Sequence, residues 1–196
     1  MSSDITAIAL FILALYVTPG PATLSLAASG AALGLRQSMS YFLGIQTGLI
    51  SILLLCMFGL AFIVTDYPGV YAFLKYCSLI YILYLSYKIS QSRPNTSSNQ
   101  NTFTYRSGLA LNLINPKAYV ANIAVIAQFS RQDDYFASVT LIFIMILICV
   151  SISNIFWVMT GERIARLFQS ERATTIIQYS FAALLSSSVI YATFFI

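Results

Sequence analysis

The sequence contains no histidine, and charged side chains make up only 8% of its 196 residues. A soluble domain carries about 25% charged residues, so this composition excludes an ordinary water-soluble fold. With 59% hydrophobic residues and no stretch long enough for a separate soluble domain, nearly all of the chain is expected to lie in a membrane. The net charge of +4 therefore indicates no nucleic-acid partner, and membrane lipid is the expected surrounding.

The residues that carry most enzyme and metal chemistry are also missing. Without histidine, the chain lacks the commonest general base and the commonest metal ligand. All six acids lie in loops or at segment ends, so the usual carboxylate proton relay of membrane proteins is absent. The sequence has no hydrolase, metalloprotease or nucleotide-binding motif and no C-x-x-C pair. We therefore expect no enzyme activity, no cofactor and no metal site.

Six apolar segments account for most of the chain, and each is long enough to cross a hydrocarbon core of about 30 Å. The polar stretch 91–104 separates the third segment from the fourth and is expected to be a flexible cytoplasmic linker. The sequence thus predicts an all-α membrane protein, a single transmembrane domain over residues 1–196 built from two three-helix repeats, 1–90 and 105–196. The six segments are 5–33, 38–64, 69–90, 107–130, 135–160 and 174–195.

The basic residues predict how these segments cross the membrane. Arg131 alone lies on one side, whereas seven basic residues fall in the connections on the other side. Basic loops stay in the cytoplasm, so the chain is expected to be a multi-pass membrane protein with both termini outside and the linker in the cytoplasm. Because each repeat has three spans, the second is inverted relative to the first. The seven residues are Arg36, Lys88, Arg93, Arg106, Arg163, Arg166 and Arg172.

Two of the segments contain helix breakers at corresponding places. Thr18-Pro19-Gly20-Pro21 interrupts the first segment, and Asn115-Pro116-Lys117 interrupts the fourth about 95 residues later. Each proline removes a backbone N–H and clashes with the preceding turn. Membranes tolerate such breaks where they are buried or line a polar cavity. Paired broken helices are typical of a transporter's substrate site.

The broken helices suit an anionic ligand. Pro21 and Pro116 are well placed to begin new half-helices, with Thr18 and Asn115 as candidate N-caps. Each half-helix would present free N–H groups and the positive end of its dipole at mid-membrane, where an amino-acid carboxylate could bind. The alternative is that these prolines only kink two packed helices.

Lys117 is the one charged residue expected near the centre of the membrane beside a break. A charge there is costly and marks a functional site by default. Lys117 could pair with a carboxylate, or lose its proton when the site is empty. Asn112, Asn115, Tyr119 and Asn122 share one helical face, and a continuous helix would point Lys117 almost the opposite way. Either the break re-aims Lys117, or it faces a different neighbour.

Three further polar residues lie within apolar segments and need partners there. Gln46, Tyr81 and Asn154 are each candidates for substrate binding, and for each a structural hydrogen bond inside the bundle is an equal alternative. The Gly44-xxx-Gly48 pair is expected to let two helices pack closely.

The two broken motifs resemble those of a known family. Val17-Thr-Pro-Gly-Pro-Ala-Thr-Leu and Gly108-Leu-Ala-Leu-Asn-Leu-Ile-Asn-Pro-Lys-Ala are similar to the opening motifs of the two halves in the lysine exporter family, which includes homoserine/threonine resistance proteins. Gly34-Leu-Arg-Gln-Ser and Asn154-Ile-Phe-Trp further resemble its cysteine/O-acetylserine exporter branch. The resemblance implies export of amino acids by antiport driven by the proton gradient.

This sequence departs from the family at two places. Family members often carry an acid where Leu49 stands, and another where Asn154 stands. Without these acids, a lysine or arginine substrate is disfavoured and the coupling ion stays open. We therefore expect an exporter of small neutral amino acids or related metabolites, working by rocking one repeat against the other.

Two other functions remain open on the sequence alone. One is transport of another small solute such as a metal cation, which would have to rest on carbonyl, Asn and Gln oxygens. The other is a non-transporting membrane assembly subunit, which would tolerate loss of Pro21. The oligomeric state is open, a homo-oligomer included.

Overall fold

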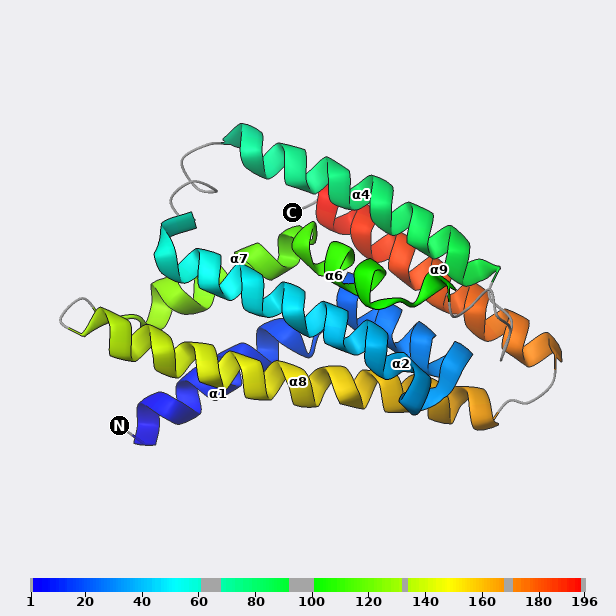
Figure 1. Cartoon of the computed structure of the whole chain (residues 1–196), viewed down its shortest axis with the longest axis horizontal. Helices are drawn as coiled ribbons and strands as arrows, with labels where there is room; N and C mark the ends of the chain where they lie inside the picture. Colours follow the sequence, from blue (N-terminus) through cyan, green and yellow to red (C-terminus); the bar gives the residue numbers. More distant parts are fainter. Residues whose placement is uncertain (1, 61–67, 92–100, 132–133, 168–170, 195–196) are drawn as a thin grey trace.

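The structure is a computed structural model that describes residues 2–60, 68–91, 101–131, 134–167 and 171–194. These residues form helices joined by short connections and include no strand, which confirms the all-α class. Figure 1 shows the helices lying lengthwise in one bundle. They are α1 (Ser2–Tyr16), α2 (Pro21–Leu55), the π-helical turn η1 (Cys56–Leu60), α4 (Pro68–Ser90), α6 (Tyr105–Leu113), α7 (Pro116–Phe129), α8 (Tyr135–Leu167) and α9 (Glu171–Phe194).

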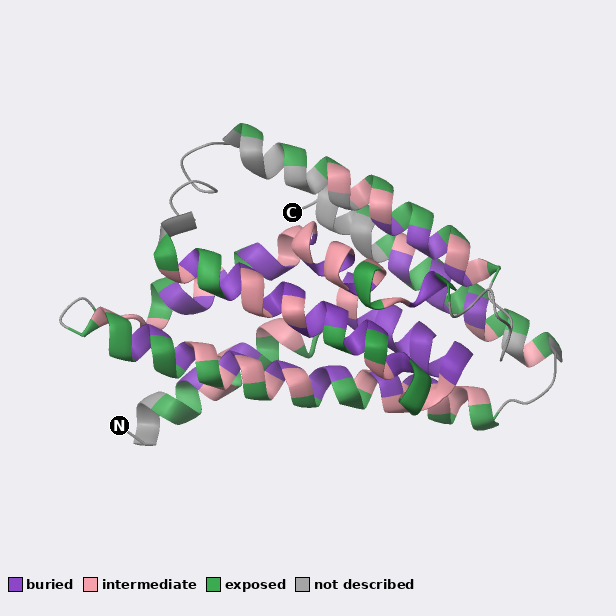
Figure 2. Ribbon diagram, in the orientation of Figure 1, coloured by how far each residue is buried: buried purple, intermediate pink, exposed green. Residues whose placement is uncertain are grey.

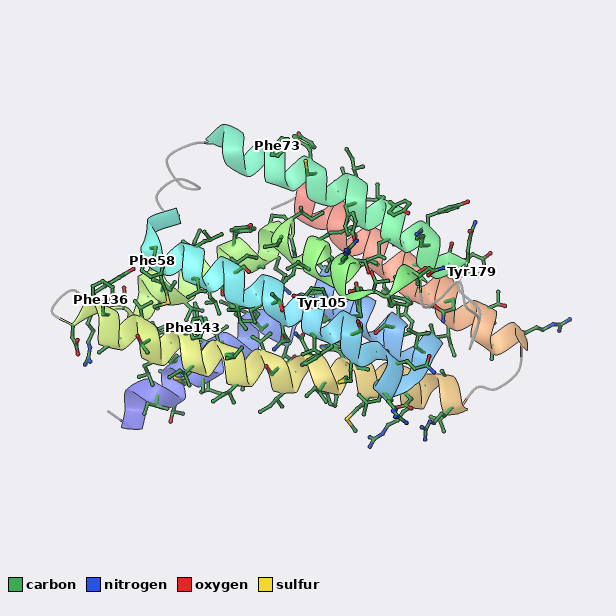
Figure 3. All side chains as sticks on the ribbon, in the orientation of Figure 1. Phe58, Phe73, Tyr105, Phe136, Phe143 and Tyr179 are labelled. Carbon is green, nitrogen blue, oxygen red and sulfur yellow. The ribbon has the colours of Figure 1, made fainter. Side chains whose placement is uncertain are left out.

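The described helices are those of a membrane protein. Two of them, Pro21–Phe58 and Tyr135–Leu167, are long and apolar enough to cross a membrane, and α6 with α7 makes a third if this pair, bent by 59°, is one broken span. Large apolar side chains point outward into the surroundings, among them the labelled Phe58, Phe73 and Phe136 (Figure 3). The six spans and the inverted repeats stay predictions.

α2 bends sharply at Gly34, where φ is 76° and ψ is 171°. Only glycine adopts this conformation without strain, so Gly34 is the place where the chain can turn. The first part of α2 runs to one end of the bundle and the second part runs back (Figure 1). Residues 23–33 of the first part are all buried, which places this half-helix in the centre of the bundle (Figure 2).

Glycines bring α2 and α8 into backbone contact. A Cβ added to Gly30 would lie 2.0 Å from the Val158 carbonyl oxygen, and one added to Gly161 would lie 1.9 Å from that of Ala27. Any side chain at either position would therefore push the two helices apart.

A second set of glycines joins α2 to α6. A Cβ on Gly44 would lie 2.1 Å from the Tyr105 carbonyl oxygen, and one on Gly48 would lie 2.8 Å from Asn112 Cβ. The predicted packing role of the Gly44-xxx-Gly48 pair is thus confirmed.

The last residues of the predicted linker pack against the bundle. Residues 92–100 lie outside the described residues, whereas Thr102 and Phe103, close to its predicted end, are buried. The Phe103 ring packs edge-on against Tyr41 with 5.3 Å between ring centroids. The packed part of the chain that follows the linker therefore includes residues before 105.

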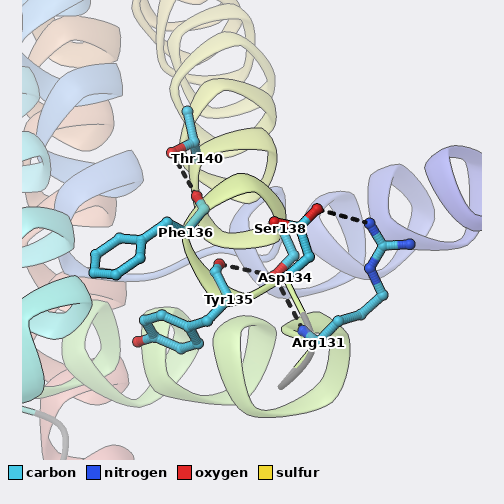
Figure 4. A network of polar contacts seen from close by, with 6 residues as sticks. All are labelled: Arg131, Asp134, Tyr135, Phe136, Ser138 and Thr140. Carbon is cyan, nitrogen blue, oxygen red and sulfur yellow. Dashed lines mark hydrogen bonds and ion pairs between the residues drawn. The ribbon is translucent and has the colours of Figure 1, made fainter.

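The predicted basic connections gather at one end of the bundle. The Gly34 bend, the ends of α4 and α8 and the start of α9 all lie at the right of Figure 1, while α6 begins nearer the middle of the bundle, where Tyr105 is labelled in Figure 3. At the opposite end, Arg131 lies in the connection before α8, and its backbone N–H donates to Ser138 Oγ at 3.0 Å while its guanidinium lies 3.8 Å from the Asp134 carboxylate (Figure 4).

Candidate substrate site

The first break lies between α1 and α2, and its cap is not the one expected. α2 begins at Pro21 as predicted, but its N-cap is Gly20 rather than Thr18. The Gly20 N–H donates to Thr23 Oγ1 at 2.8 Å, so a hydroxyl inside the helix does the capping. The Thr18 hydroxyl instead donates to the Leu15 carbonyl at 2.9 Å and so extends the end of α1.

The second break, between α6 and α7, has the predicted form. α7 begins at Pro116 and Asn115 is its N-cap, with extended backbone and Oδ1 accepting from the Lys117 N–H at 3.1 Å. The Tyr119 hydroxyl donates to the Leu113 carbonyl at 2.7 Å. A carbonyl at the interrupted end of α6 thereby gains a partner inside the protein, as a break in a membrane requires.

Lys117 joins the two breaks. Its Nζ donates to the Thr18 carbonyl at 3.0 Å and to Thr18 Oγ1 at 2.8 Å. A Cβ on Gly20 would lie 3.0 Å from this Nζ, so glycine leaves room for the ammonium. The break therefore re-aims Lys117 toward the first break, which decides between the two alternatives left by the sequence. The Thr18 carbonyl extends the end of α1, where the helix dipole is negative.

A second contact between the breaks was not foreseen. The Tyr16 hydroxyl, from the last residue of α1, donates to Asn122 Oδ1 on α7. The signal in the sequence was a tyrosine next to a helix break in an apolar segment, because its hydroxyl had to find a partner.

A pocket opens where the two breaks meet. It holds about 450 Å³ of space free of protein atoms, its open mouth included. Lys117 is the one charged side chain among the described residues that line it. Six residues predicted as substrate-binding line the pocket: Gly20, Pro21, Asn112, Asn115, Lys117 and Asn154. The other lining residues are Tyr16, Ala22, Thr23, Ile45, Leu49, Ala118 and Val150.

The remaining candidates lie outside this lining. Gln46 sits behind Asn154, whose Nδ2 donates to Gln46 Oε1 at 2.9 Å. Thr18 contacts the pocket through Lys117. Pro19 is exposed in the first break, and Pro116 starts α7.

Tyr81 lies apart from the pocket lining. Its hydroxyl donates to the Ser107 carbonyl at 2.9 Å, so the geometry favours the structural alternative for this residue. Within the described part of the chain, no three His, Cys, Asp or Glu side chains come together as a metal site would need.

Comparison with known proteins gives a family match over most of the chain. Residues 13–191 match the LysE type translocator family. Two curated proteins named cysteine/O-acetylserine efflux protein are each 26% identical to this chain. The one from Klebsiella pneumoniae aligns over 84% of this chain and 85% of its own length, and the one from Escherichia coli K12 over 78% and 80%. No solved structure matches the chain significantly.

Proposed function

Because the chain belongs to the LysE type translocator family, we propose that it is a secondary transporter exporting small neutral amino acids or related metabolites across the bacterial inner membrane. The relatives' names favour cysteine- or O-acetylserine-like solutes, with homoserine and threonine as close neighbours in size. The observation that carries the proposal is that Lys117 spans both helix breaks at the wall of one pocket.

The substrate carboxylate binds between the half-helices that begin at Pro21 and Pro116, next to Lys117. The first turn of each helix offers N–H groups and a positive dipole end, as in other sites for anions. An ammonium has three donors, and Thr18 accepts from two of them, which leaves one for the ligand. The positive charge of Lys117 faces no carboxylate among the described lining residues.

The pocket wall supports a substrate with an uncharged side chain. Leu49 and Asn154, which stand where family members often have acids, both line the pocket. A lysine or arginine side chain would therefore add a second positive charge with no acid to balance it, and an uncompensated charge is costly in a desolvated site. The apolar Ile45, Ala118 and Val150 suit a short side chain instead.

Coupling and orientation follow from the family resemblance and the basic end of the bundle. Transport runs as antiport with protons, and both termini lie on the periplasmic side. A reporter enzyme that works only in the cytoplasm, fused after Ile196, should be inactive, whereas the same reporter inserted in the linker 92–100 should be active. Activity of the C-terminal fusion would contradict this orientation.

Export itself is tested in vesicles that contain the purified protein. They are loaded with a mixture of cysteine, O-acetylserine, homoserine, threonine, lysine and arginine, and an inward proton gradient is imposed. The neutral amino acids should leave faster than from protein-free vesicles, while lysine and arginine should not. Equal loss of all six, with or without protein, would contradict the proposal.

A further inference from the structure

Three asparagines line the pocket, and backbone groups fix which way two of their amides point. Asn112 Nδ2 donates to the Ile45 carbonyl at 2.8 Å. Asn115 Oδ1 accepts from the Lys117 N–H at 3.1 Å. A carbonyl only accepts and an N–H only donates, so neither amide can be turned over without losing its bond. Asn112 Oδ1 and Asn115 Nδ2 are thereby directed away from these backbone partners.

A relay of hydrogen bonds fixes the third amide. Ser151 Oγ lies 2.5 Å from the Leu147 carbonyl, a separation at which the hydroxyl hydrogen must lie between the two oxygens. Because Ser151 donates there, it accepts from Gln46 Nε2, and Gln46 Oε1 then accepts from Asn154 Nδ2 at 2.9 Å. The Leu147 carbonyl thus sets the direction of every bond up to Asn154.

The free ends of these amides face the pocket. Among the described residues, no donor reaches Oδ1 of Asn112 or Asn154, and no acceptor reaches Nδ2 of Asn115. None of the three atoms is among the polar atoms that are sealed in the core without a partner. Since all three residues line the pocket, it is the pocket that these atoms reach.

We propose that Asn112 Oδ1 and Asn154 Oδ1 accept hydrogen bonds from the substrate's ammonium group, and that Gln46 and Ser151 are the positioning residues that turn Asn154 toward it. The proposal rests on the carboxylate site of the proposed function. Lys117 and Asn115 supply donors for a carboxylate, and the two oxygens supply acceptors, so the site discriminates for a free amino group. Neutral amide oxygens thus bind the ammonium in a site where other family members often carry acids.

The test compares three thiol acids that differ at the amino group. Vesicles are loaded separately with L-cysteine, with N-acetyl-L-cysteine or with 3-mercaptopropionate, which has no nitrogen. Released thiol is measured and corrected for protein-free vesicles. Wild-type protein should release cysteine at least roughly tenfold faster than either analogue. An analogue without the ammonium leaves a desolvated amide oxygen without a hydrogen-bond donor, which weakens its binding. The ratio within one preparation cancels differences in protein amount.

Two variants and two controls separate positioning from packing. Asn154→Leu and Ser151→Ala should each reduce the preference for cysteine severalfold, because one removes the acceptor and the other lets Gln46 and Asn154 turn over. Ser151→Thr keeps the hydroxyl and should restore the preference. Thr140→Ala removes a hydroxyl that bonds the Phe136 carbonyl at 2.7 Å on the same helix, away from the relay, and should leave the preference unchanged (Figure 4).

Each contrary result has its own meaning. Equal release of cysteine and 3-mercaptopropionate by the wild type would overturn the ammonium site while leaving carboxylate export in place. A preference that survives both Asn154→Leu and Ser151→Ala would overturn the assignment of these residues. Release of none of the three compounds above the protein-free rate would overturn the proposed function and this inference with it.

Discussion

Replacing Lys117 by methionine removes the ammonium while keeping an unbranched side chain of similar length. In the unliganded structure, the loss affects two hydrogen bonds, to the carbonyl and hydroxyl oxygens of the exposed Thr18. Water can replace both bonds, so the effect on stability should be small. In the complex, the variant loses a charge-assisted hydrogen bond to the substrate carboxylate in a partly desolvated site. Such bonds contribute about 1.5–3 kcal/mol.

That energy corresponds to a roughly 10- to 150-fold increase in Kd. The assay is equilibrium binding of labelled L-cysteine to the detergent-purified protein, with cysteamine, the same molecule without its carboxylate, as a second ligand. Lys117→Met should weaken binding of cysteine by this factor. The affinity for cysteamine should not fall, because its ammonium gains nothing from a neighbouring positive charge.

Lys88→Met is the matched control. The Lys88 ammonium lies 5.1 Å from the centroid of the Tyr84 ring in the last turn of α4, and Lys88 is not among the residues lining the pocket. Its replacement should change neither affinity. If Lys117→Met left cysteine binding unchanged, or weakened cysteine and cysteamine equally, Lys117 would not be the carboxylate partner and would serve only to hold the two breaks together.

Two further substitutions test the scaffold around the site. Gly161→Ala places a Cβ 1.9 Å from the Ala27 carbonyl oxygen and should lower the free energy of unfolding by about 1–3 kcal/mol or more. The control Gly69→Ala, with no atom within 4 Å of the added Cβ, should leave it unchanged. Thermal unfolding in detergent compares the two variants, and equal midpoints would contradict the close α2–α8 contact. Asn115→Ala should lower the free energy of unfolding by about 0.5–2 kcal/mol because it removes the N-cap of α7. Asn115→Ser can still cap the helix and should recover most of this loss. If the serine variant were as unstable as the alanine variant, loss of the cap would not be the cause.

The parts of the site that the sequence predicts are those fixed by local backbone chemistry. Pro21 and Pro116 begin helices because a proline at the first position has no hydrogen bond to lose. Asn115 caps α7 because its side chain reaches the free N–H two residues on. These outcomes depend on a few neighbouring residues, so they can be read without the tertiary structure.

Side-chain contacts between residues far apart in the sequence cannot be predicted in this way. Thr18 has a hydroxyl suited to a cap, but Gly20 is the N-cap of α2 and Thr18 faces Lys117, which is 99 residues away. The direction of Lys117 depends on the angle between α6 and α7, and a helical wheel drawn through the break gives the wrong face. Similarly, Tyr16 and Asn122 meet only because both breaks lie side by side.

The packing also indicates which helices can move during transport. α2 belongs to the first repeat, yet glycines hold its backbone directly against α8 at Gly30 and Gly161 and against α6 at Gly44. Close-packed helices do not slide independently, so we expect α2, α6 and α8 to move together, which would limit rocking to the parts outside this group. α4 and α9 are hydrogen-bonded to each other, since Ser86 donates to the Ala182 carbonyl at 2.8 Å and accepts from Ser186. They join α2 and α6 through larger side chains and the Tyr81 hydrogen bond rather than through backbone contact at glycines.

We therefore expect the pair α4–α9 to move against a fixed core of α2, α6 and α8. Spin labels at the exposed positions Leu54 on α2 and Ile148 on α8 should keep their distance when saturating cysteine is added, whereas labels at Leu54 and Ile176 on α9 should change theirs. The labels report distances between helices directly, and neither pair includes a residue lining the pocket. A shift in the 54–148 distance with a constant 54–176 distance would mean that the glycine contacts open during transport and that α2 and α8 are the moving parts.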